Sequence, residues 1–323
     1  MICGEQAEYG GYLELGFGPT KPHYPGALAL NTARNCLAYV LRARNIRTLH
    51  LPSYLCGAVK NTCAALGVQA VEYPIGRNFL PLPGLEPGPD EWVYLVNYYG
   101  QLGPEQAQTL SKRYGRRVIW DNVQAFFQPP CPGMDTIYTC RKFFGVPDGA
   151  YLFTDCRLEE PLERDESRER MAHLLGRADT GSANRFYGRY AENEERLETL
   201  PLRRMSRLTE TLLGAIDCDW AARQRNENYA RLARELDGVN GLALHPPVGP
   251  YAYPLLLPKG EQVRRALQAQ KVYVPLLWPE AAAAEHDPVG REYARNILPL
   301  PVDQRYGPED MERMLAILTP LLG

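Results

Sequence analysis

One lysine stands in an apolar setting in the segment "TCRKFFGVPDGAYLF", residues 139–153. Lys142 follows the apolar run 136–138 and precedes two phenylalanines, whereas most lysines lie on solvated helix faces. Burial lowers the pKa of an ammonium group and frees the amine as a nucleophile. Lys142 is therefore either an ordinary loop residue or a catalytic amine, and its neighbours in the fold must decide between the two.

Other polar side chains stand where predicted strands end. Asp121 ends the strand "RRVIW", and Gln124 follows three residues later. Asn97 ends the strand before it, and the hydroxyl of Thr139 comes three residues before Lys142. Because ligands bind at the carboxyl ends of parallel strands, we expect these side chains to meet in one crevice.

The stretch "ALNTARN", residues 29–35, predicts the start of the first long helix. Thr32 is a candidate N-cap, and Ala33 and Arg34 follow it. A helix start presents free N–H groups and a positive dipole end, which together favour a phosphate group. Arg34 either adds an ion pair there or is a solvated first-turn residue.

Together these residues suit pyridoxal 5'-phosphate (PLP). That cofactor needs a lysine, a carboxylate beside its pyridine nitrogen, donors to its phenolic oxygen and a phosphate site. Tyr54, at the end of "LPSYL", either lines the cofactor or substrate or packs in the core. The candidate residues, in the order of those needs, are Lys142; Asp121; Asn97 or Gln124; and Thr139 with Thr32, Ala33 and Arg34.

The residues that position these groups alternate between helical and strand patterns. Apolar residues at helical spacing predict helices over residues 32–45, 57–67 and 104–115. Short apolar runs predict strands over residues 47–52, 68–74, 91–100 and 116–121. Such alternation predicts an α/β fold with a mostly parallel central sheet flanked by helices.

The pattern changes to charged helix after residue 157. We predict helices over residues 158–175, 182–200, 203–236 and 261–270 and a last one from residue 308, with strands over residues 251–258, 272–277 and 296–303. The domain prediction is an N-terminal arm (1–25), a large domain (26–215) and a smaller C-terminal α+β domain (216–323). The segment "GFGPTK", residues 16–21, is interpreted as a turn and not as a phosphate loop.

Composition argues against several classes of function. A formal net charge of −2 and a pI near 6.3 give no field that would attract nucleic acid or an anionic membrane. The histidines stand too far apart for a metal motif, so no metal site is expected. No apolar run reaches spanning length and the first residues do not resemble a leader, so we expect a cytoplasmic protein.

Five segments carry a resemblance to a known family. They are "NTARNCL" (31–37), "LPSYLC" (51–56), "WDNVQA" (120–125), the Lys142 segment and "NILPLPVDQRY" (296–306). The chain resembles the DegT-type sugar aminotransferases, which are PLP-dependent enzymes of fold type I. The resemblance implies a PLP-transferase fold, a Schiff base on Lys142 and a homodimer with its sites at the subunit interface.

The function that the resemblance implies is transamination of a keto group on a nucleotide-linked sugar, with glutamate as the amino donor. One alternative is a PLP-dependent sugar dehydratase or lyase, although those relatives commonly replace the lysine by histidine. Another is a non-catalytic scaffold or sensor, since Leu202 in "LRRMS" stands where the family commonly has an asparagine that reaches the neighbouring subunit. A nicotinamide oxidoreductase would need a glycine fingerprint that this sequence lacks.

Overall fold

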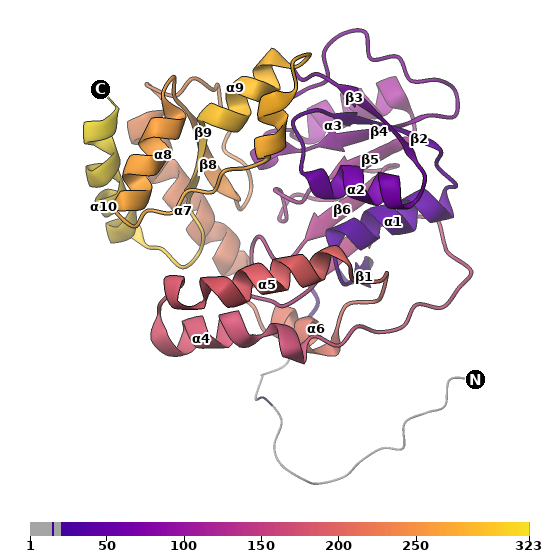
Figure 1. Cartoon of the computed structure of the whole chain (residues 1–323), viewed down its shortest axis with the longest axis horizontal. Helices are drawn as coiled ribbons and strands as arrows, with labels where there is room; N and C mark the ends of the chain where they lie inside the picture. The colour runs from indigo at the N-terminus through magenta and orange to yellow at the C-terminus, as the bar shows by residue number, and fades with distance from the viewer. Residues whose placement is uncertain (1–14, 16–20, 323) are drawn as a thin grey trace.

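The computed structural model describes residue 15 and residues 21–322, and a seven-stranded sheet forms its centre (Figure 1). The strand order is β1-β7-β6-β5-β4-β2-β3. Strands β2 to β6 pair in parallel, whereas β7 is antiparallel to both β6 and β1. This confirms the mostly parallel sheet. The strands are β1 (Leu28–Leu30), β2 (Thr48–Pro52), β3 (Gln69–Tyr73), β4 (Trp92–Val96), β5 (Val118–Asp121), β6 (Asp135–Thr139) and β7 (Ala150–Phe153).

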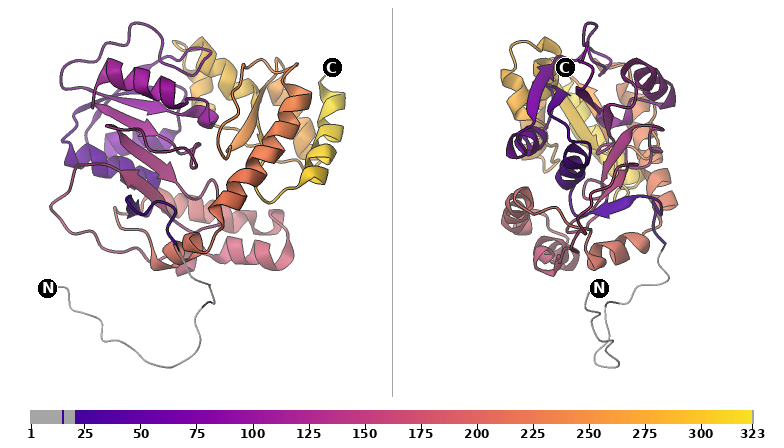
Figure 2. Two further views of the ribbon diagram at one scale, coloured as in Figure 1. Left: turned by 180° about the vertical axis from the view of Figure 1, so that it is seen from behind. Right: turned by 90° about the vertical axis from the view of Figure 1, so that its right-hand side faces the viewer.

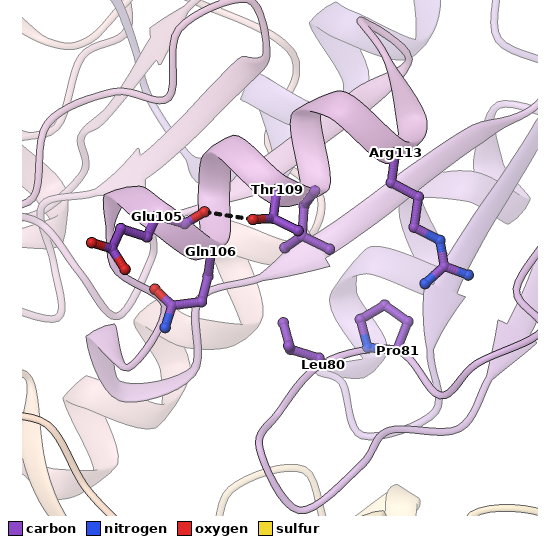
Figure 3. Close-up of a pocket in the computed structure, with 7 residues that line it drawn as sticks. Leu80, Pro81, Glu105, Gln106, Thr109 and Arg113 are labelled. Carbon is purple, nitrogen blue, oxygen red and sulfur yellow. Dashed lines mark hydrogen bonds between the residues drawn. The ribbon is translucent and has the colours of Figure 1, made fainter.

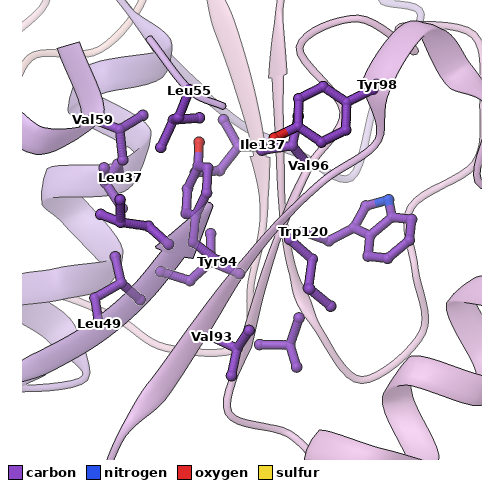
Figure 4. Packing of buried hydrophobic residues seen from close by; sticks show 14 of the residues in the cluster. Leu37, Leu49, Leu55, Val59, Val93, Tyr94, Val96, Tyr98, Trp120 and Ile137 are labelled. Carbon is purple, nitrogen blue, oxygen red and sulfur yellow. The ribbon is translucent and has the colours of Figure 1, made fainter. Parts of the chain in front are cut away.

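Helices cover both faces of the sheet. Helices α1 (Ala33–Ala43) and α2 (Gly57–Ala65) lie on one face, and α3 (Pro104–Tyr114) lies on the other (Figures 1 and 2). Figure 4 shows Tyr94 on the same side as Leu37 and Val59, and Trp120 on the opposite side. All four side chains are buried, so each face of the sheet excludes water against its helices.

A C-terminal unit packs beside the sheet around the two-stranded antiparallel sheet of β8 (Ala252–Leu256) and β9 (Ile297–Pro301). Trp278 and Tyr293 of this part nevertheless pack into the core of the main sheet. The predicted domain boundaries therefore stay predictions, and residues 1–14 and 16–20 of the arm, with most of "GFGPTK", lie outside the described residues. The helices of this half of the chain are α4 (Ala172–Thr180), α5 (Tyr187–Glu198), α6 (Arg207–Gly214), α7 (Cys218–Leu236), α8 (Gly260–Ala269), α9 (Pro288–Asn296) and α10 (Pro308–Leu318).

Two predicted elements are wrong, and the single helix predicted over residues 203–236 is two helices, α6 and α7. Residues 158–167 form no helix: Arg164 pairs with Arg204 in an isolated β-bridge, and the carbonyl of Glu163 accepts from the amide of Arg204 at 2.8 Å. Residues 272–277 form no strand, because Pro275 interrupts the apolar run and Lys271 before it has a φ of 63°. Backbone pairing and backbone angles override the side-chain pattern at both places.

Short 3-10 turns complete the described chain: Tyr98–Gly100, Arg168–Arg170, Asn184–Phe186, Pro279–Ala283 and Thr319–Leu321. Within residues 21–322, none of the helices combines the length and apolar character that crossing a bilayer requires. The cysteines of that part are all free thiols, and among them Cys56 at the start of α2 is exposed.

Candidate active site

The ends of β5 and β6 bring three of the predicted residues together. These two strands are parallel neighbours, with Asp121 paired to Ile137. Asp121 ends β5, Thr139 ends β6, and Lys142 lies in the turn that follows β6. Burial raises the pKa of Asp121 and lowers that of Lys142, and the charge of each group opposes the shift of the other.

Asp121 is oriented by the strand beside it. The side chain is 3% exposed, the hydroxyl of Tyr94 donates to its Oδ2 at 2.7 Å, and the amide of Val123 donates to its Oδ1 at 2.8 Å. Burial raises the pKa of Asp121, whereas the Lys142 charge and both hydrogen bonds lower it. The carboxylate is thus fixed in direction and needs a cationic partner to stay ionised.

Lys142 is held in a tight turn, since the amides of Phe143 and Phe144 both donate to the carbonyl of Cys140, at 3.0 and 2.9 Å. Burial lowers the pKa of its amine, and the charges of Asp121 and then of more distant groups oppose that shift. A lowered pKa leaves more of the amine free at neutral pH, so Lys142 is suited to nucleophilic attack on a carbonyl.

Gln124 carries an unsatisfied donor. It is fully buried, its Oε1 accepts from the amide of Tyr99 at 2.8 Å, and its Nε2 has no partner among the described residues. Asn97 differs, because its amide donates to Asn122 and Gln128 and its Oδ1 accepts from Leu102. Of the two candidate donors, Gln124 is therefore the one with capacity to bind a ligand atom.

The start of α1 is coupled to the lysine segment. Thr32 caps the helix, its Oγ1 accepting from the amide of Asn35 at 3.1 Å, and the first-turn N–H groups of Ala33 and Arg34 have no partner within a helix. Gly149 donates to the carbonyl of Asn31 at 2.6 Å and accepts from the amide of Cys140 at 3.0 Å. Gly149 has a φ of 114°, which favours glycine, and an added Cβ would lie 2.9 Å from Thr209.

Two other candidates have structural partners. Arg34 lies 3.8 Å from Glu198, so its side chain is engaged in a partly exposed ion pair. Tyr54 is buried among aromatic rings: its ring stacks on Tyr98 at 5.2 Å, and Trp278 lies edge-on at 4.6 Å. Their predicted contacts with a cofactor stay predictions.

The residues present fit PLP. Lys142 offers an amine, Asp121 an oriented carboxylate, the orphaned Nε2 of Gln124 a donor, and the start of α1 free N–H groups. A buried donor without a partner is rare in a native protein and indicates a missing acceptor. Within residues 21–322, no cluster of His, Cys, Asp and Glu is arranged to hold a metal ion.

Sequence reasoning missed Tyr94 and Tyr251. Tyr94 lies inside β4, two residues before Val96, and Val96 pairs with Asp121. The register of β4 against β5 would therefore have identified Tyr94. The ring of Tyr251 lies 5.7 Å from Nζ of Lys142. No sequence signal identifies Tyr251, because it reaches the site from the C-terminal unit.

Two hollows lie away from these residues. One of about 310 Å³ lies between α3 and the loop that carries Leu80 and Pro81, as Figure 3 shows. The other, of about 870 Å³, is lined by Trp120, Gln128 and His245 among others. Neither is lined by a predicted site residue, so neither is the site of the Lys142 chemistry.

Comparison with solved structures shows the fold, while no family model and no curated protein matches the sequence. A DegT/DnrJ/EryC1/StrS aminotransferase from Brucella abortus superposes with a TM-score of 0.62 at 15% identity, covering 92% of this chain and 86% of that one. NtdA from Bacillus subtilis with bound PMP gives 0.64 at 13%, covering 92% and 73%. DesI in the presence of its TDP-sugar product gives 0.63 at 15%, covering 92% and 80%. The chain has the fold of these enzymes, so the predicted fold type I is confirmed.

Proposed function

We propose that the protein is a PLP-dependent aminotransferase that acts on a keto group of a nucleotide-linked sugar. The observation that carries the proposal is that the oriented Asp121 carboxylate and the Lys142 turn follow neighbouring parallel strands, and that the charge of each group acts on the other. Solved structures of the same fold support two parts of the proposal: DesI in the presence of its TDP-sugar product supports the substrate class, and NtdA with bound PMP supports the cofactor.

Each residue has a defined task in this proposal. PLP, when bound, supplies an electron-poor ring that stabilises negative charge on the substrate carbon. Asp121 would hold a proton at the ring nitrogen, and Gln124 would donate to the phenolic oxygen through Nε2. The start of α1, with Thr139, would bind the phosphate. Lys142 would hold the cofactor covalently and, once displaced, would move a proton at Nζ.

The finer parts of the proposal rest on the family resemblance. We propose glutamate as the amino donor, a homodimer as the working assembly and the cytoplasm as the location. The retained Lys142 favours transfer of an amino group over the dehydratase alternative.

The direct test is the lysine itself. Purified protein with added PLP should show a visible absorption band, and borohydride reduction should fix the cofactor to the Lys142 peptide, as mapped by mass spectrometry. Lys142→Ala should lose both signals while its circular dichroism spectrum stays unchanged.

Lys60 provides the matched control, because it lies on α2 and pairs with Glu72 at 2.8 Å. Lys60→Ala should keep the band and the adduct. A reduced adduct at Lys60 or Lys112, or a band that survives in Lys142→Ala, contradicts the assignment.

A further inference from the structure

One buried guanidinium connects the Lys142 turn to the C-terminal unit. Arg225 on α7 is 1% exposed, and its Nη2 donates to the carbonyl of Phe143, the residue after Lys142, at 3.1 Å. Its Nη1 donates to the carbonyl of Pro250, the residue before Tyr251, at 2.8 Å. The same side chain therefore holds the two peptide segments that carry Lys142 and Tyr251.

Further contacts fix Arg225 in place. Its Nε donates to Oε1 of Gln304 at 2.7 Å, and Nε2 of Gln304 donates to the same Phe143 carbonyl at 2.9 Å. The guanidinium also lies over the Phe143 ring, 4.7 Å from its centroid. Burial lowers the pKa of Arg225 to about 10, and the charge of Asp303 opposes this. A charged group so buried is stable only because its donors are paired.

The segments that Arg225 holds meet at the lysine amine. Nζ of Lys142 lies 5.7 Å from the centroid of the Tyr251 ring. The face of an aromatic ring attracts a cation, and this attraction is stronger where water is excluded. The ring therefore favours the protonated amine, in opposition to burial.

We propose that Tyr251 stabilises the protonated form of the Lys142 amine and that Arg225 is the positioning residue that holds ring and amine together. The inference rests on the proposed role of Lys142, which must accept and release a proton at Nζ. Groups whose charge also favours the protonated amine are Asp121 on β5, Cys56 at the start of α2 and Glu194 on α5. Glu194 is itself paired with Arg141, beside Lys142.

The test titrates Lys142 in the protein without PLP. The rate of Lys142 acetylation by acetic anhydride is measured against pH by mass spectrometry, with Lys60 as an internal reference. Tyr251→Leu removes the aromatic face, so the apparent pKa of Lys142 should fall by about 0.5 to 1 pH unit. Tyr251→Phe keeps the face and should leave the pKa within about 0.2 units of the wild-type value.

The sign of the shift separates the proposal from a loss of packing. A smaller side chain that merely admitted water would raise the pKa of Lys142, because solvation favours the ammonium form. An unchanged or raised pKa in Tyr251→Leu overturns the role of Tyr251.

Arg225 is tested by coupling. Arg225→Gln should lower the pKa of Lys142 in the same direction as Tyr251→Leu, and the double variant should show less than the sum of the two shifts. Arg264→Gln is the matched control: Arg264 is also buried and donates to two carbonyls, those of Arg295 and Ile297, at 3.3 and 2.8 Å. The control should lose thermal stability and keep the wild-type pKa of Lys142.

Two results overturn the role of Arg225: an equal pKa shift in Arg264→Gln, or fully additive shifts in the double variant. If Arg225→Gln does not fold, Gln304→Leu removes the second donor to the Phe143 carbonyl and should produce a smaller shift of the same sign. The titration uses protein without cofactor. Its result can therefore be interpreted even if the aminotransferase proposal fails.

Discussion

At the scale of single residues, Asp121 shows how surroundings decide a role. Burial favours its neutral acid, while Tyr94, Val123 and the charge of Lys142 favour the carboxylate. These opposing effects leave an oriented group whose ionisation depends on a nearby cation. A protonated ring nitrogen would be such a cation, and it would be held in line by a charge-assisted hydrogen bond.

We therefore expect Asp121→Asn to keep the fold and to bind PLP while losing turnover. An amide cannot hold a positive charge at the ring nitrogen, so the rate should fall roughly 100-fold or more. The measurement is kcat at saturating PLP, with the visible band as the check on binding.

Asp148→Asn is the matched control for this change. Asp148 is also buried, and it accepts from the amide and hydroxyl of Ser206 at 2.9 and 2.7 Å. That variant should lose stability but not the chemical step. Near wild-type turnover in Asp121→Asn would refute the role of Asp121.

The proposed site residues that the sequence indicated are those whose position follows from a strand end. Asp121 comes directly after an apolar run, and Gln124 and Lys142 each follow a strand end by three residues, so their place at this edge of the sheet could be predicted. Arg225 and Tyr251 could not, because α7 and the segment before β8 reach the site only through tertiary packing.

At the scale of elements, the proposed phosphate site depends on two segments that Gly149 joins. Thr139 ends β6, and Gly149 bonds both to the residue after Thr139 and to Asn31 before α1. The strand end and the helix start are thereby held in one arrangement. We expect a phosphate bound there to contact both.

Thr139→Ala should weaken PLP binding about 10-fold, the effect of one hydrogen bond to a charged group. Fluorescence titration of the apo-protein with PLP measures it. Thr136→Ala, on the same strand, is the control, because its hydroxyl already pairs with backbone groups of Cys131 and Met134. Equal PLP affinity in wild type and Thr139→Ala would exclude Thr139 from the phosphate site.

Helices and strands could be predicted where the spacing of apolar residues matches the conformation that the backbone adopts. Helix α1 and strands β2 and β5 combine an apolar pattern with a clear cap or stop, and the sequence located them closely. Residues 158–167 and 272–277 were mispredicted, since their conformation depends on pairing with Arg204 and on Pro275. Neither the pairing with Arg204 nor the effect of Pro275 can be seen in the spacing of apolar residues.

At the scale of the whole molecule, the proposed site combines residues from three parts of the chain. The sheet supplies Asp121 and Lys142, α5 places Glu194 beside the lysine turn, and the C-terminal unit supplies Tyr251. Anything that orders these parts relative to one another should raise the affinity for PLP. A second subunit, as the resemblance implies, is the proposed source of that order.

The last prediction follows from this dependence: PLP occupancy should fall as the protein is diluted through its dimer dissociation range. A ligand that binds only the assembled state stabilises that state by mass action. The coupling is reciprocal, so saturating PLP should tighten dimerisation by the same factor by which dimerisation tightens PLP binding. Analytical ultracentrifugation with and without PLP measures one factor, and absorbance of the bound cofactor on dilution measures the other. Lys142→Ala is the control. Without the covalent bond to PLP, the effect of PLP on dimerisation and the effect of dimerisation on PLP binding should decrease equally. PLP occupancy that ignores the monomer–dimer balance would place the site within a single subunit.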